Sequence, residues 1–274
     1  MHRSSFRSRV AGSPYLVWAA LFILVPLGMV AYYSFTDQSG AFTLAYMARI
    51  SDYTGPFLLS IWLGLLATVI CLVIAYPLAY LIANSGEKRQ RTMMLLMMLP
   101  MWMNFLLRTY SWMTILGDNG LINSLVTAIG LDPLKLINTR GAVVLGMVYD
   151  FLPYMVLPIY TIMLKIDRSL VEAAQDLGAG RLEVIKNVIF PLSVPGIVSG
   201  VTMVFVPSVS TFYISQKLGG TGTLLIGDII EQQFQLGETS LHVGASLSFV
   251  LMILIFVCLT VMNRFSDSDG SVLV

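Results

Sequence analysis

Two charged side chains lie inside long apolar runs of the sequence, where they could bind an ion or each other. Asp150 stands between Tyr149 and Phe151, and Arg108 lies in an earlier apolar run. A carboxylate near the middle of a bilayer costs about 2.5–3.5 kcal/mol on insertion scales, so it needs a compensating partner. That partner could be a cation, which the neighbouring aromatic rings would also attract. Arg108 could instead neutralise Asp150 in a structural ion pair, and both alternatives stay open.

Polar and aromatic side chains in the same apolar runs extend this candidate cation site into a candidate path. Their ring faces attract cations weakly, which suits transient binding. The same residue types also form aromatic belts at membrane interfaces, and that interpretation is equally open for many of them. The candidate path residues are Asp150, Tyr149, Trp102, Asn104, Arg108, Tyr110 and Tyr213.

The other chemically reactive residues do not form a catalytic or metal-binding pattern. The two cysteines, Cys71 and Cys258, lie far apart inside apolar runs, where small buried side chains are expected. The two histidines, His2 and His242, lie near the ends of the chain, so a metalloenzyme or Ser-His motif cannot be built. No Gly-x-x-x-x-Gly-Lys-Ser/Thr phosphate loop occurs. We therefore expect no enzyme activity, metal or cofactor in this chain.

A polar segment between two apolar runs, residues 166–191, has the pattern of a short amphipathic helix. Ser169 and Glu172 have the spacing of a capping box at its start. Gly178 follows the apolar stripe, where a helix end favours a residue that tolerates positive φ. An apolar face on a loop predicts a docking surface for another protein. The residues of this face are Leu170, Ala173, Ala174 and Leu177.

Composition indicates that most of the chain lies in lipid. Of 274 residues, 57% are hydrophobic and 11% are charged, whereas soluble domains carry roughly 25% charged residues. A net charge of +1 excludes a strongly basic nucleic-acid-binding protein. Apolar runs of about 20 residues can cross a bilayer only as helices. Six such runs are expected, at 14–36, 57–83, 93–116, 142–164, 193–215 and 242–262.

The basic residues predict how these spans are oriented. The two ends of the chain, the 84–92 loop and the 165–192 loop together contain eleven Lys and Arg residues, against four in the alternate loops. Because cytoplasmic loops are enriched in Lys and Arg, both termini and the 166–191 loop are expected in the cytoplasm. The predicted organisation is a cytoplasmic segment 1–13, a six-helix membrane domain 14–262 and a cytoplasmic tail 263–274. The first span is expected to be retained rather than cleaved as a signal peptide.

The 166–191 loop resembles the cytoplasmic signature of bacterial ABC importer permeases. That signature is Glu-Ala-Ala, a glycine four residues later, and an aliphatic residue before a hydrophobic-Pro pair. This chain has Glu172-Ala173-Ala174, then Gly178, Val188 and Phe190-Pro191. The resemblance implies an all-α integral membrane protein of the type I importer permease class, in which this loop is the coupling helix. The implied ATPase-coupling residues are Glu172, Ala173, Ala174, Asp176, Leu177, Gly178, Ala179 and Pro191.

Further segments resemble the first permease subunit of spermidine/putrescine importers. They are Leu99–Tyr110, Gly146–Tyr149, Leu152-Pro153 and Leu225–Ile230. The resemblance implies location in the bacterial cytoplasmic (inner) membrane, a polyamine substrate, a paralogous second permease, two ATPase subunits that bind ATP and Mg, and an extracytoplasmic solute-binding protein. Asp150 would then meet a substrate ammonium group. Related permeases import other small solutes, so that alternative stays open.

An ion-coupled secondary transporter is the alternative class of membrane transporter. Such transporters contain internal repeats and ionisable residues within several spans. No repeat is found here, and Asp150 and Arg108 are the charged residues within the predicted spans. A cytoplasmic docking helix also has no use in that class, so the sequence favours the ATP-driven importer.

Overall fold

The structure, a computed structural model, describes residues 15–270, and this part of the chain is helical apart from loops. Its one β pairing is an isolated bridge between Thr36 and Phe42. The predicted cytoplasmic segment 1–13 lies outside the described residues, as does the end of the predicted tail, 271–274.

Five helical segments in the described range are long and apolar enough to cross a membrane, and they correspond to five of the six predicted spans. They are Tyr15–Phe35, Ala45–Ala83, Arg140–Met163, Arg181–Ser210 and Ser240–Met262. The second and fifth predicted spans began at residues 57 and 193, but their helical segments begin earlier, at Ala45 and Arg181, and the fifth ends at Ser210 rather than 215. The predicted sixth span, 242–262, agrees with Ser240–Met262, and its helix, α13 (Glu238–Gly270), continues beyond it.

The predicted third span, 93–116, is two shorter helices rather than one. Helix α5 (Glu87–Trp102) ends just after Pro100, and two residues separate it from α6 (Phe105–Leu116). Asn104 starts α6, because its side-chain oxygen accepts a 2.8 Å hydrogen bond from the Leu106 amide. At 1.5 Å per residue each helix is shorter than the roughly 30 Å hydrocarbon core. The prediction of six single-helix spans is therefore not confirmed.

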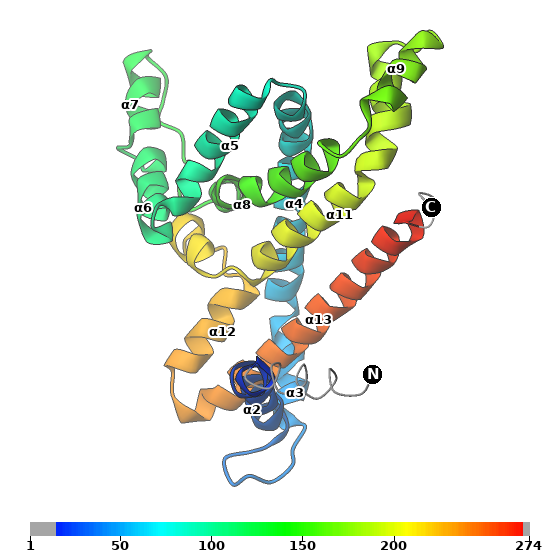
Figure 1. Ribbon diagram of the computed structural model, residues 1–274. Helices are drawn as coiled ribbons and strands as arrows, with labels where there is room; N and C mark the ends of the chain where they lie inside the picture. The colour runs from blue at the N-terminus through cyan, green and yellow to red at the C-terminus, as the bar shows by residue number, and fades with distance from the viewer. Residues whose placement is uncertain (1–14, 271–274) are drawn as a thin grey trace, which may run out of the picture. The chain divides into compact units, whose positions relative to one another are not determined.

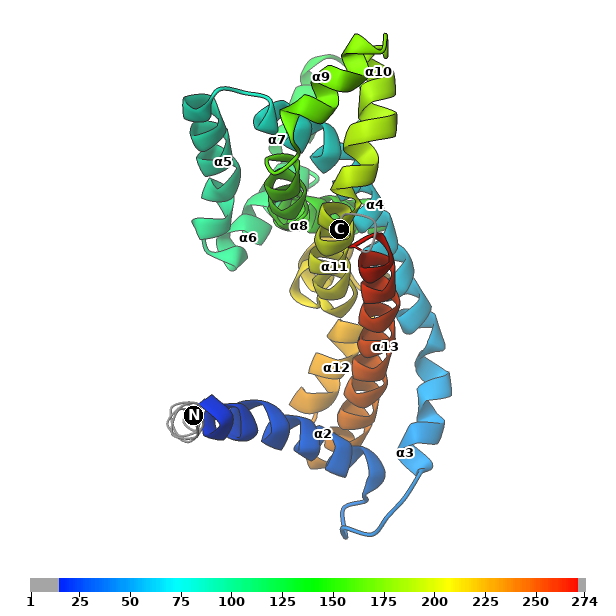
Figure 2. The same cartoon turned by 45° about the vertical axis from the view of Figure 1, so that its right-hand side comes forward.

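The chain forms two compact units, of which the larger contains Gly55–Asp228 and Ile255 onward. Its elements, besides α5 and α6, are α4 (Thr54–Ala83), α7 (Leu121–Ala128), α8 (Arg140–Met163), α9 (Arg168–Asp176), α10 (Arg181–Val184), the π-helix η3 (Ile185–Ile189), α11 (Phe190–Ser210) and the π-helix η4 (Ser215–Gly219). Helices α8 and α11 form the most extensive pair and lie side by side in Figures 1 and 2.

Two glycines explain how closely α11 approaches α8. A Cβ atom at Gly196 would lie 2.9 Å from the Pro158 carbonyl oxygen, and one at Gly200 would lie 2.7 Å from Met155 Sδ. Small residues four apart let membrane helices pack backbone to backbone. From α4, Cys71 packs into the same core as a free, buried thiol, as its apolar surroundings predicted.

The smaller unit contains the residues up to Thr54 and Ile229–Leu254. Its elements are η1 (Ala20–Leu24), α2 (Val25–Phe35), α3 (Ala45–Ala48), the 3₁₀ helix η2 (Arg49–Tyr53), most of α12 (Ile226–Gln235) and the first half of α13. The buried His242 ring stacks on Tyr46 with centroids 5.2 Å apart, and its Nδ1 lies 3.0 Å from the Tyr33 carbonyl oxygen. These contacts join α13 to the N-terminal helices of this unit.

Candidate docking loop and transmembrane path

Helix α9 begins at a different cap from the one predicted. The carboxylate of Asp167 accepts a 2.9 Å hydrogen bond from the Ser169 amide, so Asp167 is the N-cap. The predicted capping box of Ser169 and Glu172 was wrong, because the helix starts at Arg168, before Ser169. The Ser169 amide stabilises the charged carboxylate and lowers the pKa of Asp167 below its usual value. This cap is therefore ionised at neutral pH.

Gly178 ends α9 as predicted, with a φ of 86°. The Gly178 amide donates to the Gln175 carbonyl at 2.9 Å, and the Ala179 amide donates to the Ala174 carbonyl at 3.0 Å. These two bonds define a Schellman motif, which needs a left-handed residue at the position of Gly178. A side chain with a Cβ atom would strain this turn.

Three of the four residues of the predicted apolar face, Leu170, Ala173 and Leu177, are exposed, and the fourth, Ala174, is half-buried. Val171 and Ala174 pack against the core of the unit, whereas Leu170 and Leu177 face outward. Leu177 is 89% exposed. One apolar face thus holds α9 on its own chain, and the other is left uncovered. Of the predicted coupling residues, Ala174 and Ala179 are half-buried, and Glu172, Ala173, Asp176, Leu177, Gly178 and Pro191 are exposed.

The chain then enters α10, which runs on through η3 into α11 as one helical segment, Arg181–Ser210. The Glu183 carboxylate accepts a 2.8 Å hydrogen bond from the Gly180 amide and so caps this segment. Leu182 is 81% exposed beside it, while Val184 is buried. The π-turn of η3 ends two residues before Pro191, whose ring cannot fit regular α-helical hydrogen bonding to the preceding turn.

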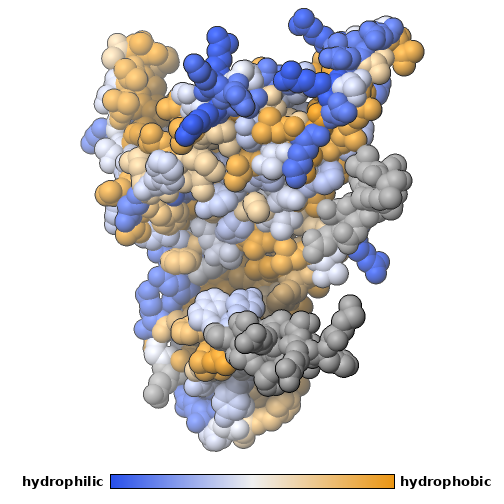
Figure 3. Space-filling view, in the orientation of Figure 1, coloured by the Kyte–Doolittle hydropathy of each residue, from blue (hydrophilic) through white to orange (hydrophobic). Residues whose placement is uncertain are grey.

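We name the exposed apolar side chains of α9 and α10 the docking patch. Its members are Leu170, Ala173, Leu177 and Leu182. Leu177 and Leu182, 89% and 81% exposed, are the most exposed large hydrophobic side chains among the residues that the structure describes. This end of the unit carries mostly polar side chains with apolar ones between them (Figure 3). Lipid accounts for exposed apolar groups on spans, but such groups among polar ones indicate a protein-docking site.

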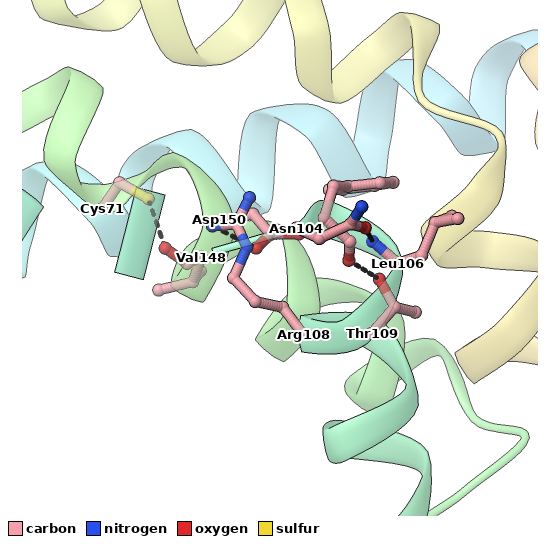
Figure 4. A network of polar contacts seen from close by, with 8 residues as sticks. Cys71, Asn104, Leu106, Arg108, Thr109, Val148 and Asp150 are labelled. Atoms are coloured by element: carbon pink, nitrogen blue, oxygen red, sulfur yellow. Dashed lines mark hydrogen bonds and ion pairs between the residues drawn. The ribbon is translucent and has the colours of Figure 1, made fainter. Parts of the chain in front are cut away.

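The two charged residues of the candidate path form the ion pair that the sequence left open. Arg108 Nη1 lies 2.9 Å from Asp150 Oδ1, with side chains 10% and 5% exposed (Figure 4). The Arg108 Nε atom is buried with no hydrogen-bond partner in the described part of the chain. The charges are thus neutralised but incompletely hydrogen-bonded, which is costly in a low-dielectric site.

The aromatic residues of the candidate path lie in three separate places. Tyr110 and Tyr213 meet edge to face with centroids 6.5 Å apart. Tyr149 meets Trp112 at 5.3 Å instead. Trp102, at the end of α5, is 75% exposed, and Asn104 is used as the cap of α6. The structure therefore brings together Arg108 with Asp150, and Tyr110 with Tyr213.

Sequence reasoning missed two residues of this region. Lys217 Nζ lies 5.8 Å from the centroid of the Tyr110 ring and 5.6 Å from that of Tyr213. Asp228 is fully buried and accepts hydrogen bonds from the Ser215 hydroxyl and the Leu225 amide. The spacing of Tyr213 and Lys217, four residues apart, was a local signal for the first contact. Nothing local predicted that Asp228 would be buried.

Comparisons with known proteins agree on the family. The family model for the inner membrane component of binding-protein-dependent transport systems matches residues 75–268. The spermidine/putrescine transport system permease protein PotB of Haemophilus influenzae is 35% identical, covering 88% of both chains. PotB of Escherichia coli K12 is 36% identical, covering 91% of this chain and 94% of its own.

Two solved structures share the fold. The chain of a bacterial ABC transporter involved in alginate import matches with a TM-score of 0.78 and 17% identity, covering 97% of this chain and 96% of that one. A chain of the inward-facing MetNI methionine ABC transporter matches with a TM-score of 0.60 and 18% identity, covering 79% of this chain and 95% of that one. At these identities the likeness concerns the fold alone. From the family model and the identity to its relatives, the chain belongs to the family of inner membrane components of binding-protein-dependent transport systems.

Proposed function

We propose that this chain is a permease subunit of an ATP-driven importer and forms part of the transmembrane path for spermidine and putrescine. The docking patch carries the proposal, because a membrane protein has no other evident use for highly exposed leucines on a capped polar loop. Relatives named as spermidine/putrescine permeases, 35–36% identical over about nine-tenths of the chain, support the polyamine substrate.

The proposed assembly contains this chain, a paralogous permease, two ATPase subunits and an extracytoplasmic solute-binding protein. ATP and Mg bind to the ATPase subunits, and this chain contributes no nucleotide site. The excess of Lys and Arg supports the proposed location of both termini and the α9 loop on the ATPase side. Each docking patch then sits in a groove of an ATPase subunit as an amphipathic helix.

Coupling follows from how α9 and α10 are attached. Val171 and Ala174 hold α9 on the core of the unit, and α10 is continuous with α11. When ATP binding closes the ATPase pair, the loop moves with its ATPase subunit and transmits that motion to the membrane helices. Glu172 and Asp176 are exposed on the same helix, where they are available to polar groups of the ATPase.

Within the membrane, Asp150 is the acidic group proposed to interact with the substrate. A substrate ammonium group would have to compete with Arg108, which lies 2.9 Å from the carboxylate. Such competition keeps binding weak, as a conduit requires, since a passing ion must also leave. Tyr149, Trp102, Asn104, Tyr110 and Tyr213 remain proposed path residues.

The test is ATP-dependent uptake of labelled spermidine and putrescine. The proteoliposomes would contain this chain with its co-purifying subunits and binding protein. We expect uptake that requires ATP and is reduced by either unlabelled polyamine. ATPase stimulation by a binding protein loaded with another solute, without polyamine uptake, would retain the importer and reject the polyamine substrate. Uptake driven by an ion gradient without ATP would reject the ATP-driven class.

A further inference from the structure

The ammonium group of Lys217 lies against two aromatic rings that come from a different helix and from the chain just before η4. Lys217 Nζ is 5.8 Å from the Tyr110 centroid and 5.6 Å from the Tyr213 centroid. Both distances are within the roughly 6 Å over which a cation and a ring face attract each other. The two rings, set edge to face, thus form a small site for a primary ammonium group.

The backbone that carries Lys217 is held firmly. The Ser215 hydroxyl donates a 2.9 Å hydrogen bond to Asp228, and both side chains are fully buried. On the next turn, Leu218 packs so closely on α8 that a Cβ atom at Gly146 would lie 2.7 Å from it. The lysine stem, with four flexible carbons, is therefore the part of η4 that can move without disrupting packing.

The neighbouring cation does not compete for this site. Arg108, on the same helix as Tyr110, pairs with Asp150 and lies over the Phe105 ring at 5.8 Å. Lys217 is thus the cation that fills the space between Tyr110 and Tyr213. Its terminal group has the same chemistry as the end of an alkyl amine.

We propose that the rings of Tyr110 and Tyr213 form a binding site for a primary ammonium group, which Lys217 fills in this conformation and yields to a substrate amine during transport. The proposal rests on the proposed polyamine substrate. It gives Lys217 the role of an internal competitor. Each time a substrate amine occupies the rings, the tethered lysine can displace it, so substrate does not remain bound in the path.

The test is equilibrium binding of labelled spermidine to the assembled transporter in nanodiscs, without ATP or binding protein. Lys217→Met removes the competitor but keeps the length of the side chain. We expect it to bind spermidine about threefold to tenfold more tightly than the wild type, the range of one cation–π contact. Equal or weaker binding by Lys217→Met would overturn the proposal.

A second set of variants distinguishes amine binding by the rings from general effects of mutation. Adding Tyr213→Leu to Lys217→Met should abolish the gain in spermidine affinity. Adding Tyr213→Phe should keep that gain, because phenylalanine retains the ring face. The matched control is Lys135→Met, which removes an exposed lysine from another loop and should bind like the wild type. Co-purification of the ATPase subunits verifies that each variant is assembled. A gain that persists in the Tyr213→Leu background would also overturn the proposal.

The ammonium site and the proposed function are tested by different experiments, so that either one can fail alone. ATP-dependent polyamine uptake by the wild type decides the function. Uptake by the wild type without a gain for Lys217→Met rejects the site alone. A gain for Lys217→Met in a complex that imports no polyamine rejects the substrate and keeps the ammonium site.

Discussion

At the scale of single residues, the ion pair of Arg108 and Asp150 is the most consequential contact in the membrane part. Both side chains are at least nine-tenths buried, yet the Arg108 Nε atom has no hydrogen-bond partner in the range described. Replacing a buried ion pair by apolar residues is often neutral, whereas removing one partner costs about 3–5 kcal/mol. Stability and substrate binding can therefore be separated by mutation at these two positions.

We predict that Arg108→Met lowers the yield of assembled transporter, because it leaves Asp150 charged and unpaired. Adding Asp150→Met should restore assembly but not polyamine uptake, since the proposed acidic contact would be missing. Size-exclusion profiles measure assembly, and labelled spermidine uptake measures function. Full uptake by the assembled double variant would assign Asp150 a purely structural role.

At the scale of elements, the turn after α9 fixes the direction in which the docking patch points. Gly178 has a φ of 86° and closes the Schellman motif. A residue with a Cβ atom pays roughly 1–2 kcal/mol in this conformation, and a β-branched one is a strong outlier there. Gly130, in the loop after α7, has a φ of 83° and is equally open around its Cα atom. The same substitution can therefore be compared at the two glycines, with similar backbone strain at both.

We predict that Gly178→Val reduces ATP-driven uptake about tenfold while Gly130→Val reduces it little. Both variants carry the same backbone strain, but only the first distorts the helix that is proposed to dock. The measurement is the amount of spermidine imported per ATP hydrolysed. Equal losses in the two variants would mean that strain alone, and not the position of the turn, explains the effect.

Local signals predicted most of the elements, and their failures have local explanations. The turn at Gly178 was predicted because a glycine follows an apolar helical stripe. The cap at Asp167 was missed because two acceptor residues, Asp167 and Ser169, stand two positions apart and both suit an N-cap. The break in the third predicted span was signalled by Pro100 and Asn104, but the uniform hydropathy around them outweighed it. The contact of Lys217 with Tyr110 depends on tertiary packing and could not be found by pattern.

At the scale of the whole molecule, the docking patch is where this chain would meet the proposed ATPase subunits. Leu177 is 89% exposed, although α9 itself is anchored on the core through Val171 and Ala174. An exposed leucine that fills a groove in a partner is typical of the few residues that dominate helix-in-groove binding. Leu131, 60% exposed in the loop after α7, is a comparable leucine that lies outside the patch.

We predict that Leu177→Asp abolishes co-purification of the ATPase subunits, because the charge would be desolvated in the groove. Leu131→Asp should leave co-purification unchanged. Pull-down of the tagged permease followed by quantification of the ATPase chain measures both. Retention of the ATPase by Leu177→Asp would place the contact elsewhere on the chain.

The continuous helical segment from Arg181 to Ser210 has a mechanical consequence. Its 30 residues extend roughly 45 Å at 1.5 Å per residue. Its first turn carries Leu182 of the docking patch, and its last residue, Ser210, lies three residues before Tyr213. Gly196 and Gly200 let its middle pack closely against α8. Because these close contacts hold the middle of the segment, we expect α8 to act as a fulcrum when its first turns are moved. In the proposed transporter a tilt imposed by the ATPase therefore reaches the Tyr213 ring directly, and one stroke of this lever would open or close the ammonium site.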